Sequence, residues 1–338
     1  MNYSQRKKDH ITLALKEKNV QGNNGLSKIR LIHSALPELN WDEIDLSTSV
    51  LGKKVPTPFF VSSMTGGFSE AVKLNSMIAK ACARRGWIMG VGSQRKGLDD
   101  PKALEEWIEI KNKFPEVLLL GNLGISQLIH TPLEKVETLV QALGAAAMII
   151  HTNALQECLQ PEGTPQFKGG IKALKNLSKN LSVPVILKET GCGFSSQNFE
   201  NLCGLGLKAV DISGYGGTHW GRIEGDRISE GDIRKQSSIT YSNWGNSTLD
   251  SLLAANKLKN KDFEVWASGG LKTGLDAAKC LALGALAVGF AHVILKQAQL
   301  GEQALEEQMF LLEHELKIAL FCTGSRDVSK LSQWEYVK

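Results

Sequence analysis

Eight short apolar segments recur along the chain, and most of them end in Gly or Asn. Stretches whose apolar positions have helical spacing separate them. Continuous apolar strands that alternate with amphipathic helices indicate a parallel sheet covered by helices. The eight segments are residues 58–67, 86–95, 116–124, 145–153, 182–193, 207–217, 263–270 and 285–291.

Eight regular units in roughly 250 residues match a closed (β/α)8 TIM barrel better than the alternative, an open doubly wound sheet. We expect one domain, because no linker rich in Pro, Gly or Ser divides the chain. Within it, residues 1–57 form an N-terminal extension, 58–295 the barrel and 296–338 a C-terminal helical region with one long helix near 298–321.

Capping signals predict several helix boundaries. Ser69 precedes a helical pattern that ends at Gly86, and Asp100-Pro101 resembles an N-cap followed by Pro at the first helical position. The run 131–134, TPLE, reads as a capping box with Gly144 at the far end. The interval 218–262 is unusually long, and we expect it to hold one helix and a mobile polar loop over the barrel mouth.

Composition indicates an ordinary globular protein of 338 residues, 42% of them hydrophobic, with a net charge of +4. No basic run is interleaved with aromatic residues, so nucleic-acid binding is not expected. The longest nearly apolar run, 282–295, has 14 residues, and a bilayer span needs about 20. The charged N-terminus lacks a signal-peptide pattern, and the six scattered cysteines suit a reducing compartment. We therefore expect a cytoplasmic protein that does not bind membranes.

The apolar run that climbs to Ile150 is followed at once by polar residues. His151 and Asn153 alternate and so face the same side of a strand, and Gln156 and Glu157 follow in the loop. A lone carboxylate beside a phosphate-bearing substrate suits Mg²⁺. The opposing interpretation makes His151 a satisfied residue of the mouth and Glu157 a surface charge, and spacing alone does not decide between the two.

Other strand ends carry a set of hydrogen-bonding groups that a flat polar heterocycle would need: Ser93, Asn122, Lys188, Ser213 and Thr218. Lys188 ends the segment VPVILK and must enter the mouth, where it could place positive charge near the N1/O2 edge of a reduced flavin. Alternatively, it is a structural lysine paired with Glu189 or Asp211.

The loops after strands seven and eight form the usual phosphate site of such barrels. Gly269 and Gly270 let the backbone approach a ligand, and Thr273 or Gly274 opens a helix with free N–H groups. The alternative is that these glycines only make tight turns. Arg95 at a strand end, together with a Lys, could grip a diphosphate. The charged run RKKDH at 6–10 lies outside the barrel, where such a run is usually a solvated tail.

Taken together, these segments resemble the type 2, FMN-dependent isopentenyl-diphosphate isomerase family over nearly the whole chain. The similarity rests on RKKDH, MTGG, GSQR, GNLG, HTNALQECLQPEG, KETGCG, SGYGGTHW and ASGGLKTGLDAAK. The combination of RKKDH with HTNALQE and PEG is specific, whereas many flavin barrels share the glycine motifs. Thr152, the TPQF that follows PEG, and His219 depart from the pattern, which has a small residue where His219 stands.

The resemblance implies interconversion of isopentenyl and dimethylallyl diphosphate with reduced FMN, Mg²⁺ and NADPH as reductant, in a homo-tetramer or homo-octamer. It implies that Gln156, His151 and Asn153 are the catalytic side chains and that Glu157 binds the metal. The implied substrate-binding residues are Arg6, Lys7, Arg95, His151, Asn153 and Gln156. The implied FMN-binding residues are Ser63, Met64, Thr65, Ser93, Asn122, Lys188, Ser213, Thr218, Gly269, Gly270 and Ala291.

Two other functions compete with this one. An FMN-dependent 2-hydroxy-acid oxidase would need a His base and a nearby Arg, but Tyr215 and Thr218 stand close to those positions. A non-catalytic flavin- or phosphate-binding barrel would need the cofactor residues but not Arg6, Lys7, Gln156 and Glu157. Loss of Mg²⁺ dependence would favour that second alternative.

Overall fold

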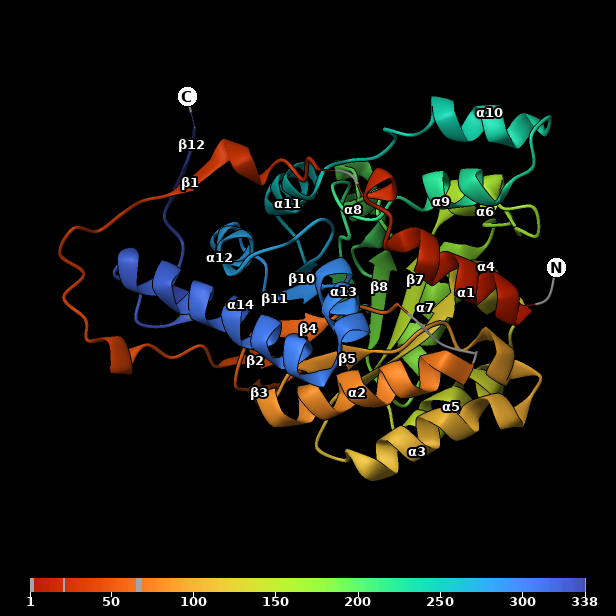
Figure 1. The fold of residues 1–338 in the computed structure, drawn as a ribbon, viewed down its shortest axis with the longest axis horizontal. Helices are drawn as coiled ribbons and strands as arrows, with labels where there is room; N and C mark the ends of the chain where they lie inside the picture. Colours follow the sequence, from red (N-terminus) through yellow and green to blue (C-terminus); the bar gives the residue numbers. More distant parts are fainter. Residues whose placement is uncertain (1–2, 21, 65–68, 338) are drawn as a thin grey trace.

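A computed structural model describes residues 3–20, 22–64 and 69–337, with the side chains of 3–7, 69 and 70 outside the description. Eight parallel strands pair in chain order and close into a barrel (Figure 1). Closure occurs where the last strand pairs with the first, with Val288 opposite Phe59. The predicted (β/α)8 barrel is confirmed segment by segment. Its strands are β4 (Phe59–Val61), β5 (Ile88–Gly90), β6 (Leu119–Gly124), β7 (Ala147–Thr152), β8 (Val185–Glu189), β9 (Ala209–Asp211), β10 (Glu264–Ala267) and β11 (Ala287–Phe290).

Helices cover the outside of the barrel (Figure 1). They are α2 (Ser69–Arg85), α3 (Glu105–Lys113), α4 (Ile125–Leu128), α5 (Leu133–Leu143), α7 (Gly170–Asn180), α8 (Ser196–Leu202), α11 (Thr248–Asn256), α12 (Gly274–Ala282), α13 (His292–Leu300) and α14 (Glu302–Cys322). The short helix α6 (Ala154–Leu159) instead lies at the barrel mouth. Short 3-10 turns are η1 (Glu17–Asn19), η2 (Leu26–Lys28), η3 (Trp41–Glu43), η4 (Arg95–Leu98), η5 (Pro101–Leu104) and η6 (Val328–Lys330).

Most of the predicted helix boundaries are confirmed. Asp100 caps η5 by accepting the Lys102 N–H, and Thr273 and Asp276 form a capping box at the start of α12. Gly144 ends α5 with a φ of 56°. The predicted capping box at 131–134 is wrong, because the Thr131 hydroxyl donates to the Gln127 carbonyl at 2.8 Å and turns back to the preceding turn.

Two predictions about long segments need correction. The interval after β9 holds three helices, α9 (Trp220–Arg227), α10 (Ile233–Thr240) and α11, where one helix and a loop were expected. The long C-terminal helix predicted near 298–321 is α14, but it begins only at Glu302, because α13 extends to Leu300 and Gly301, with a φ of 120°, breaks the helical path between them. Glycine adopts that conformation without a Cβ penalty.

Alternate strand residues divide the core into two clusters. One cluster lies between the strands and the helices, and the other fills the barrel interior. The short hairpin of β2 (Thr48–Val50) and β3 (Lys53–Val55) adds Val50 and Val55 to the interior cluster and so closes one end of the barrel. The interior strand residues, called the interior ring below, are Phe60, Ile88, Leu120, Ile149, Ile186, Ala209, Trp266 and Ala287.

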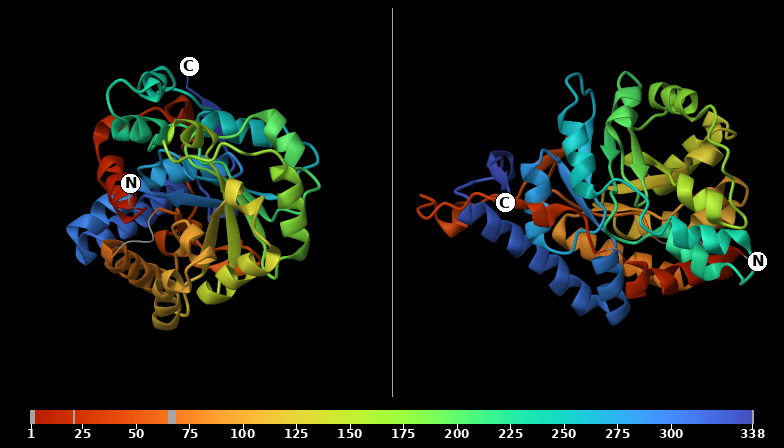
Figure 2. Two further views of the ribbon diagram at one scale, coloured as in Figure 1. Left: turned by 90° about the vertical axis from the view of Figure 1, so that its right-hand side faces the viewer. Right: turned by 90° about the horizontal axis from the view of Figure 1, so that it is seen from above.

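The N-terminal extension runs along two regions of the barrel. Its first helix, α1 (Tyr3–Ala14), packs beside α9, and the red and teal ribbons run together in both views of Figure 2. Further on, β1 (Ile29–Leu31) pairs antiparallel with β12 (Trp334–Tyr336) near the other end of the chain. The extension therefore contacts the mouth through α1 and the C-terminal region through β1.

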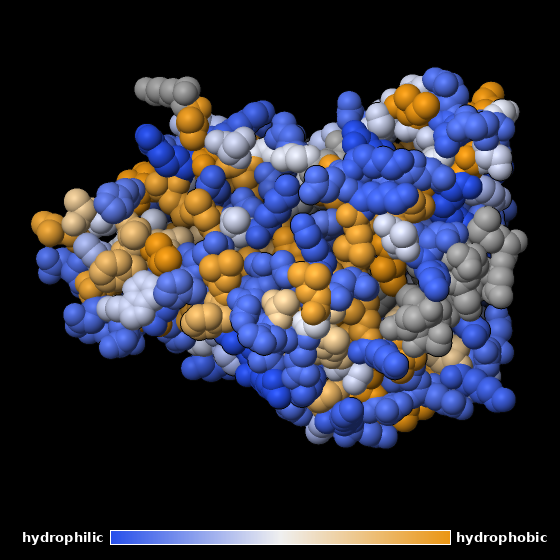
Figure 3. All heavy atoms as spheres, viewed as in Figure 1, coloured by the Kyte–Doolittle hydropathy of each residue, from blue (hydrophilic) through white to orange (hydrophobic). Residues whose placement is uncertain are grey.

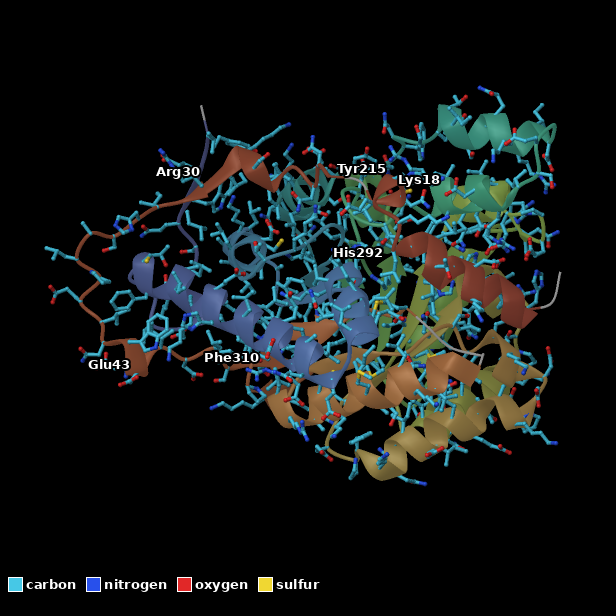
Figure 4. The ribbon with its side chains drawn as sticks, viewed as in Figure 1. Lys18, Arg30, Glu43, Tyr215, His292 and Phe310 are labelled. Carbon is cyan, nitrogen blue, oxygen red and sulfur yellow. The ribbon has the colours of Figure 1, made fainter. Side chains whose placement is uncertain are left out.

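The surface mixes charged and apolar patches (Figure 3). Leu275, Leu300, Phe310 and Leu311 are all exposed on α12 to α14, and Figure 4 labels Phe310 on α14. Among the helices of the described residues, none has both the length and the apolar character needed to cross a bilayer. The six cysteines carry free thiols.

Candidate functional site

The floor of the barrel mouth is a ring of eight residues, each near the end of one barrel strand or directly after it. Because side chains alternate in and out along a strand, residues two positions after the interior ring also face inward. At that level the apolar ring gives way to polar or small residues. This floor ring consists of Ser62, Gly90, Asn122, His151, Lys188, Asp211, Ser268 and Gly289. A pocket opens above it, lined by floor-ring residues, by the loops that follow the strands and by α1.

The segment after β7 places four polar side chains in this pocket. His151 Nδ1 lies 2.8 Å from Asn122 Oδ1. Asn153 Nδ2 donates to Gln156 Oε1 at 3.1 Å and to Glu157 Oε1 at 3.0 Å. Glu157 is only 8% exposed, so the interpretation of it as a surface charge is wrong. Its second oxygen accepts the Thr164 N–H at 2.5 Å, which fixes the carboxylate towards the pocket wall.

A buried carboxylate on α9 joins three elements around the pocket. Glu224 is 0% exposed, and its Oε1 lies 2.9 Å from His10 Nε2 on α1 and 2.8 Å from Gln156 Nε2 on α6. Arg227 binds its other oxygen and also contacts Glu162 at 2.9 Å. Burial raises the pKa of Glu224, but the hydrogen bonds from His10 and Gln156 and the Arg227 charge outweigh it and leave the pKa lowered.

His10 ends the RKKDH run, and the residue is 7% exposed. The solvated-tail interpretation therefore fails for His10, which packs edge-on against Trp220 with 5.1 Å between ring centroids. His10, Ile11 and Ala14 of α1 line the pocket. Helix α1 thus forms part of the pocket wall.

Lys188 is held by two neighbours in the floor ring. Its ammonium donates to Asp211 Oδ2 at 2.5 Å and to Ser268 Oγ at 3.1 Å. The alternative that Lys188 pairs with Asp211 is correct, yet Lys188 also lines the pocket. Glu189 instead accepts the backbone N–H groups of residues 190–193 and so shapes the following loop. Burial raises the pKa of Glu189 to about 7 despite those hydrogen bonds.

His219, where a small residue was expected, caps α9. Its Nδ1 accepts the Arg222 N–H at 3.1 Å, which requires that nitrogen to be unprotonated. Burial lowers the pKa of His219 to about 4, against a weaker opposing effect of the Trp244 carbonyl. The helix that carries Glu224 therefore begins at a neutral histidine.

The loops after β10 and β11 leave room for a phosphate. Gly269 and Gly270 have φ values of 102° and 74°, and a Cβ at either position would lie 2.1 to 2.3 Å from the backbone of Gly214 or Gly216. Alanine does not fit there, so the turn requires glycine. Helix α13 follows directly after Ala291, and its first residue, His292, is labelled in Figure 4. A helix N-terminus and glycine-rich turns suit an anion.

Orphaned hydroxyl groups test whether a flavin fits this pocket. Ser62 Oγ and Ser63 Oγ are buried and have no hydrogen-bond partner among the described residues, although both side chains line the pocket. Buried polar groups are normally satisfied. A polar heterocycle over the floor ring, with its phosphate at the glycine turns, would satisfy them, so the residues present fit FMN.

The pocket gathers nearly all the side chains that sequence analysis singled out. Thr65 lies outside the described residues, and the side chains of Arg6 and Lys7 are not described, although their backbone belongs to α1. The remaining predicted residues line the pocket: Ser63, Met64, Ser93, Arg95, Asn122, His151, Asn153, Gln156, Glu157, Lys188, Ser213, Thr218, Gly269, Gly270 and Ala291.

Sequence reasoning missed three residues that the structure places at the site, namely His10, Ser62 and Glu224. Strand alternation could have found Ser62, because it stands two residues after the interior residue Phe60. Glu224 had no comparable signal, because it lies in a helical insertion whose partners, His10 and Gln156, are far away in the sequence.

The fold and pocket define a flavin-type (β/α)8 barrel, and the family model for FMN-dependent dehydrogenases matches residues 8–111 and 121–337. The chain is 46% identical to the isopentenyl-diphosphate delta-isomerase of Bdellovibrio bacteriovorus, covering 99% of this chain and 98% of the relative. It is 48% identical to the enzyme of that name from Legionella pneumophila strain Corby, covering 98% and 97%. The chain therefore belongs to the FMN-dependent dehydrogenase family and, within it, to the isopentenyl-diphosphate delta-isomerases.

Solved structures of hydroxy-acid enzymes share the fold. An active mutant of (S)-mandelate dehydrogenase superposes with a TM-score of 0.70 at 16% identity, covering 99% of this chain and 100% of that one. This likeness concerns the fold alone. The hydroxy-acid oxidase alternative requires a catalytic His base in the loop after β9. At that position this chain has Tyr215, whose hydroxyl donates to Asn243 Oδ1 at 3.2 Å.

Proposed function

We propose that this protein interconverts isopentenyl diphosphate and dimethylallyl diphosphate in the pocket above the floor ring, as the names of its relatives suggest. One observation carries the proposal. The polar segment after β7, which the resemblance assigns to the substrate, lines the same pocket as the flavin-type strand ends. A non-catalytic flavin-binding barrel would have no need of that segment.

The reaction moves a double bond, so a proton must be added at C4 and another removed at C2. Reduced FMN, held by the predicted flavin residues such as Lys188 and Ser213, would supply electron density and a transferable proton for this reaction. Gln156, His151 and Asn153 line the pocket and would orient the substrate, with Gln156 fixed by its bond to Glu224. The amide groups of Gln156 and Asn153 are poor acids and bases, which suits a role in positioning.

The diphosphate would be held by basic groups at the pocket edge. Arg95 lines the pocket, and Arg6 and Lys7 belong to α1, whose later residues line it as well. Charge-assisted hydrogen bonds from such groups supply remote binding energy that positions the hydrocarbon. His151 would help at the inner end of this diphosphate site.

Glu157 would bind Mg²⁺. Its carboxylate lines the pocket, and among the described residues no three His, Cys, Asp or Glu side chains gather as a metal site. Mg²⁺ usually takes one or two carboxylates and completes its shell with phosphate oxygens and water. A single Glu beside the diphosphate therefore fits a metal that arrives with the substrate.

Further parts of the proposal concern the surroundings of the enzyme. NADPH would keep the flavin reduced in a cytoplasmic setting. The exposed apolar residues of α12 to α14, Leu275, Leu300, Phe310 and Leu311, would contact other copies in a homo-tetramer or homo-octamer.

The test is an anaerobic assay with isopentenyl diphosphate, FMN and Mg²⁺, with and without NADPH or dithionite. We expect dimethylallyl diphosphate only when the flavin is reduced, with no stoichiometric consumption of NADPH. Purified protein should also be yellow or bind added FMN. Bound FMN without product under either condition would assign the pocket to another substrate, and failure to bind FMN would refute the cofactor as well.

A further inference from the structure

Lys188, Asp211 and Ser268 stand on adjacent strands in the floor ring and form a closed hydrogen-bonded triangle. Lys188 donates to Asp211 Oδ2 at 2.5 Å and to Ser268 Oγ at 3.1 Å, and the Ser268 hydroxyl donates to Asp211 Oδ1 at 2.7 Å. An ammonium group has three donors. Two of them are used inside the triangle, so its geometry fixes the direction of the third.

The triangle also balances charge. The Lys188 side chain is 6% exposed and that of Asp211 is 1% exposed, so water screens neither group well. Among the described residues, Lys188 lines the pocket and Asp211 does not. A ligand above the floor ring therefore contacts the lysine, while the lysine and its carboxylate partner together carry a net charge of zero.

We propose that Asp211 is a positioning residue that sets how much positive charge Lys188 presents to bound FMN, and thereby its reduction potential and the protonation state of its reduced form. This inference rests on the proposed function, because it requires FMN above the floor ring. An uncompensated cation would stabilise the anionic reduced flavin, which has released a proton. The charge-balanced Lys188–Asp211 pair favours the neutral reduced flavin. This form keeps the proton that the enzyme has to supply to the substrate in an isomerisation without net redox change.

Replacement of the carboxylate by its neutral isostere, Asp211→Asn, tests the inference. Lys188 would then be a buried cation without its counter-charge. We expect the reduction potential of bound FMN to rise, because affinity for the reduced form increases relative to the oxidised form by on the order of tenfold. The absorbance spectrum of the reduced holoenzyme should shift towards the anionic form at a pH where the unmodified enzyme is neutral.

Glu264→Gln is the matched control. It removes a carboxylate from another Lys–carboxylate pair, in which Lys208 and Glu264 lie 2.8 Å apart. Glu264 begins β10, the strand that ends at Ala267 directly before Ser268. The flavin potential of this control should stay at the original value. An Asp211→Asn holoenzyme with unchanged potential and spectrum would overturn the inference while leaving the isomerase proposal intact. Failure of the unmodified protein to bind FMN would overturn both.

Asp211→Asn could also prevent folding, because it leaves a buried charge unpaired. The double variant Asp211→Asn/Lys188→Met removes both charges and is compared with Lys188→Met alone. We expect the flavin potential of the single variant to lie below that of the double variant, since only the single variant keeps the buried anion. Equal potentials in these two proteins would refute an electrostatic influence of Asp211 on the flavin.

Discussion

Gln156 on α6 donates a hydrogen bond to the buried Glu224 carboxylate on α9, with 2.8 Å between Nε2 and Oε1. The same oxygen lies 2.9 Å from His10 Nε2 on α1. One carboxylate oxygen therefore connects the segment after β7 with the two helices that cover the mouth. Any change at Glu224 alters the orientation of Gln156 without touching the floor ring.

Glu224→Gln should lower kcat by about 10- to 100-fold, because loss of the charged acceptor releases Gln156 from its fixed orientation. The Kd for FMN should stay unchanged, since Glu224 does not contact the floor ring. Steady-state kinetics and FMN fluorescence quenching measure the two quantities. Asp226→Asn is the control on the same helix, where Asp226 pairs with Lys18 at 2.7 Å. Equal losses in both variants would mean that only the placement of α9 matters.

Glu157→Gln should abolish most activity, with partial recovery at high Mg²⁺ and with FMN binding intact. The amide keeps the shape of the side chain but removes the charge that Mg²⁺ prefers. A Mg²⁺ titration of the rate, beside an FMN binding curve, tests this expectation. Collapse of FMN binding would show instead that Glu157 supports the fold through Asn153 and Thr164.

Ser62→Ala should weaken FMN binding by about fivefold and leave the apoprotein as stable as before, or slightly more stable. The Ser62 hydroxyl lacks a partner among the described residues, so only a hydrogen bond to a ligand can offset the free-energy cost of its desolvation. Ser178→Ala is matched, because its hydroxyl is also buried and unpartnered but belongs to α7, away from the pocket. A change in FMN affinity of the same size in both variants would contradict a flavin contact at Ser62.

His219 should make the fold sensitive to acid. Its pKa is about 4 in the folded protein and 6.5, the ordinary histidine value, in the unfolded chain, so the unfolded chain binds the proton more readily between these values. Stability is therefore present above pH 6.5 and is lost as pH falls towards 4, by roughly 3 kcal/mol. His219→Asn keeps a capping acceptor without that titration and should flatten the acid limb of Tm against pH. An identical pH profile would exclude His219 as the cause.

Arg6→Ala should raise the KM for isopentenyl diphosphate strongly while changing kcat less, because a diphosphate contact acts mainly in binding. Initial rates at saturating FMN and Mg²⁺ give both constants. An unchanged KM would mean that the beginning of RKKDH is a solvated tail that does not bind the diphosphate, even though His10 in the same run is buried.

Local periodicity made much of this architecture predictable. Strands of the barrel show as short apolar runs, and alternation then places His151, Asn122 and Lys188 at the mouth. Asn153 and Glu157 follow from the same segment. These residues could be found because each depends on its distance from a strand end.

Tertiary contacts account for what the sequence could not reveal. The pairing of Glu224 with His10 joins residues 214 positions apart, and no local pattern encodes it. Thr131 has the right spacing for a capping box, yet its hydroxyl donates to the Gln127 carbonyl of the preceding turn instead of capping the following helix. Such competition between hydrogen-bond partners is settled only by the folded geometry.

The floor ring has a consequence for how such a protein can acquire new chemistry. Each strand contributes one residue to it, and the apolar interior ring lies one layer below. Substitutions of floor-ring residues outside the Lys188–Asp211–Ser268 triangle therefore alter what the pocket recognises while the packing that closes the barrel stays the same. A laboratory library confined to Ser62, Asn122 and His151 would sample new ligands on an intact scaffold.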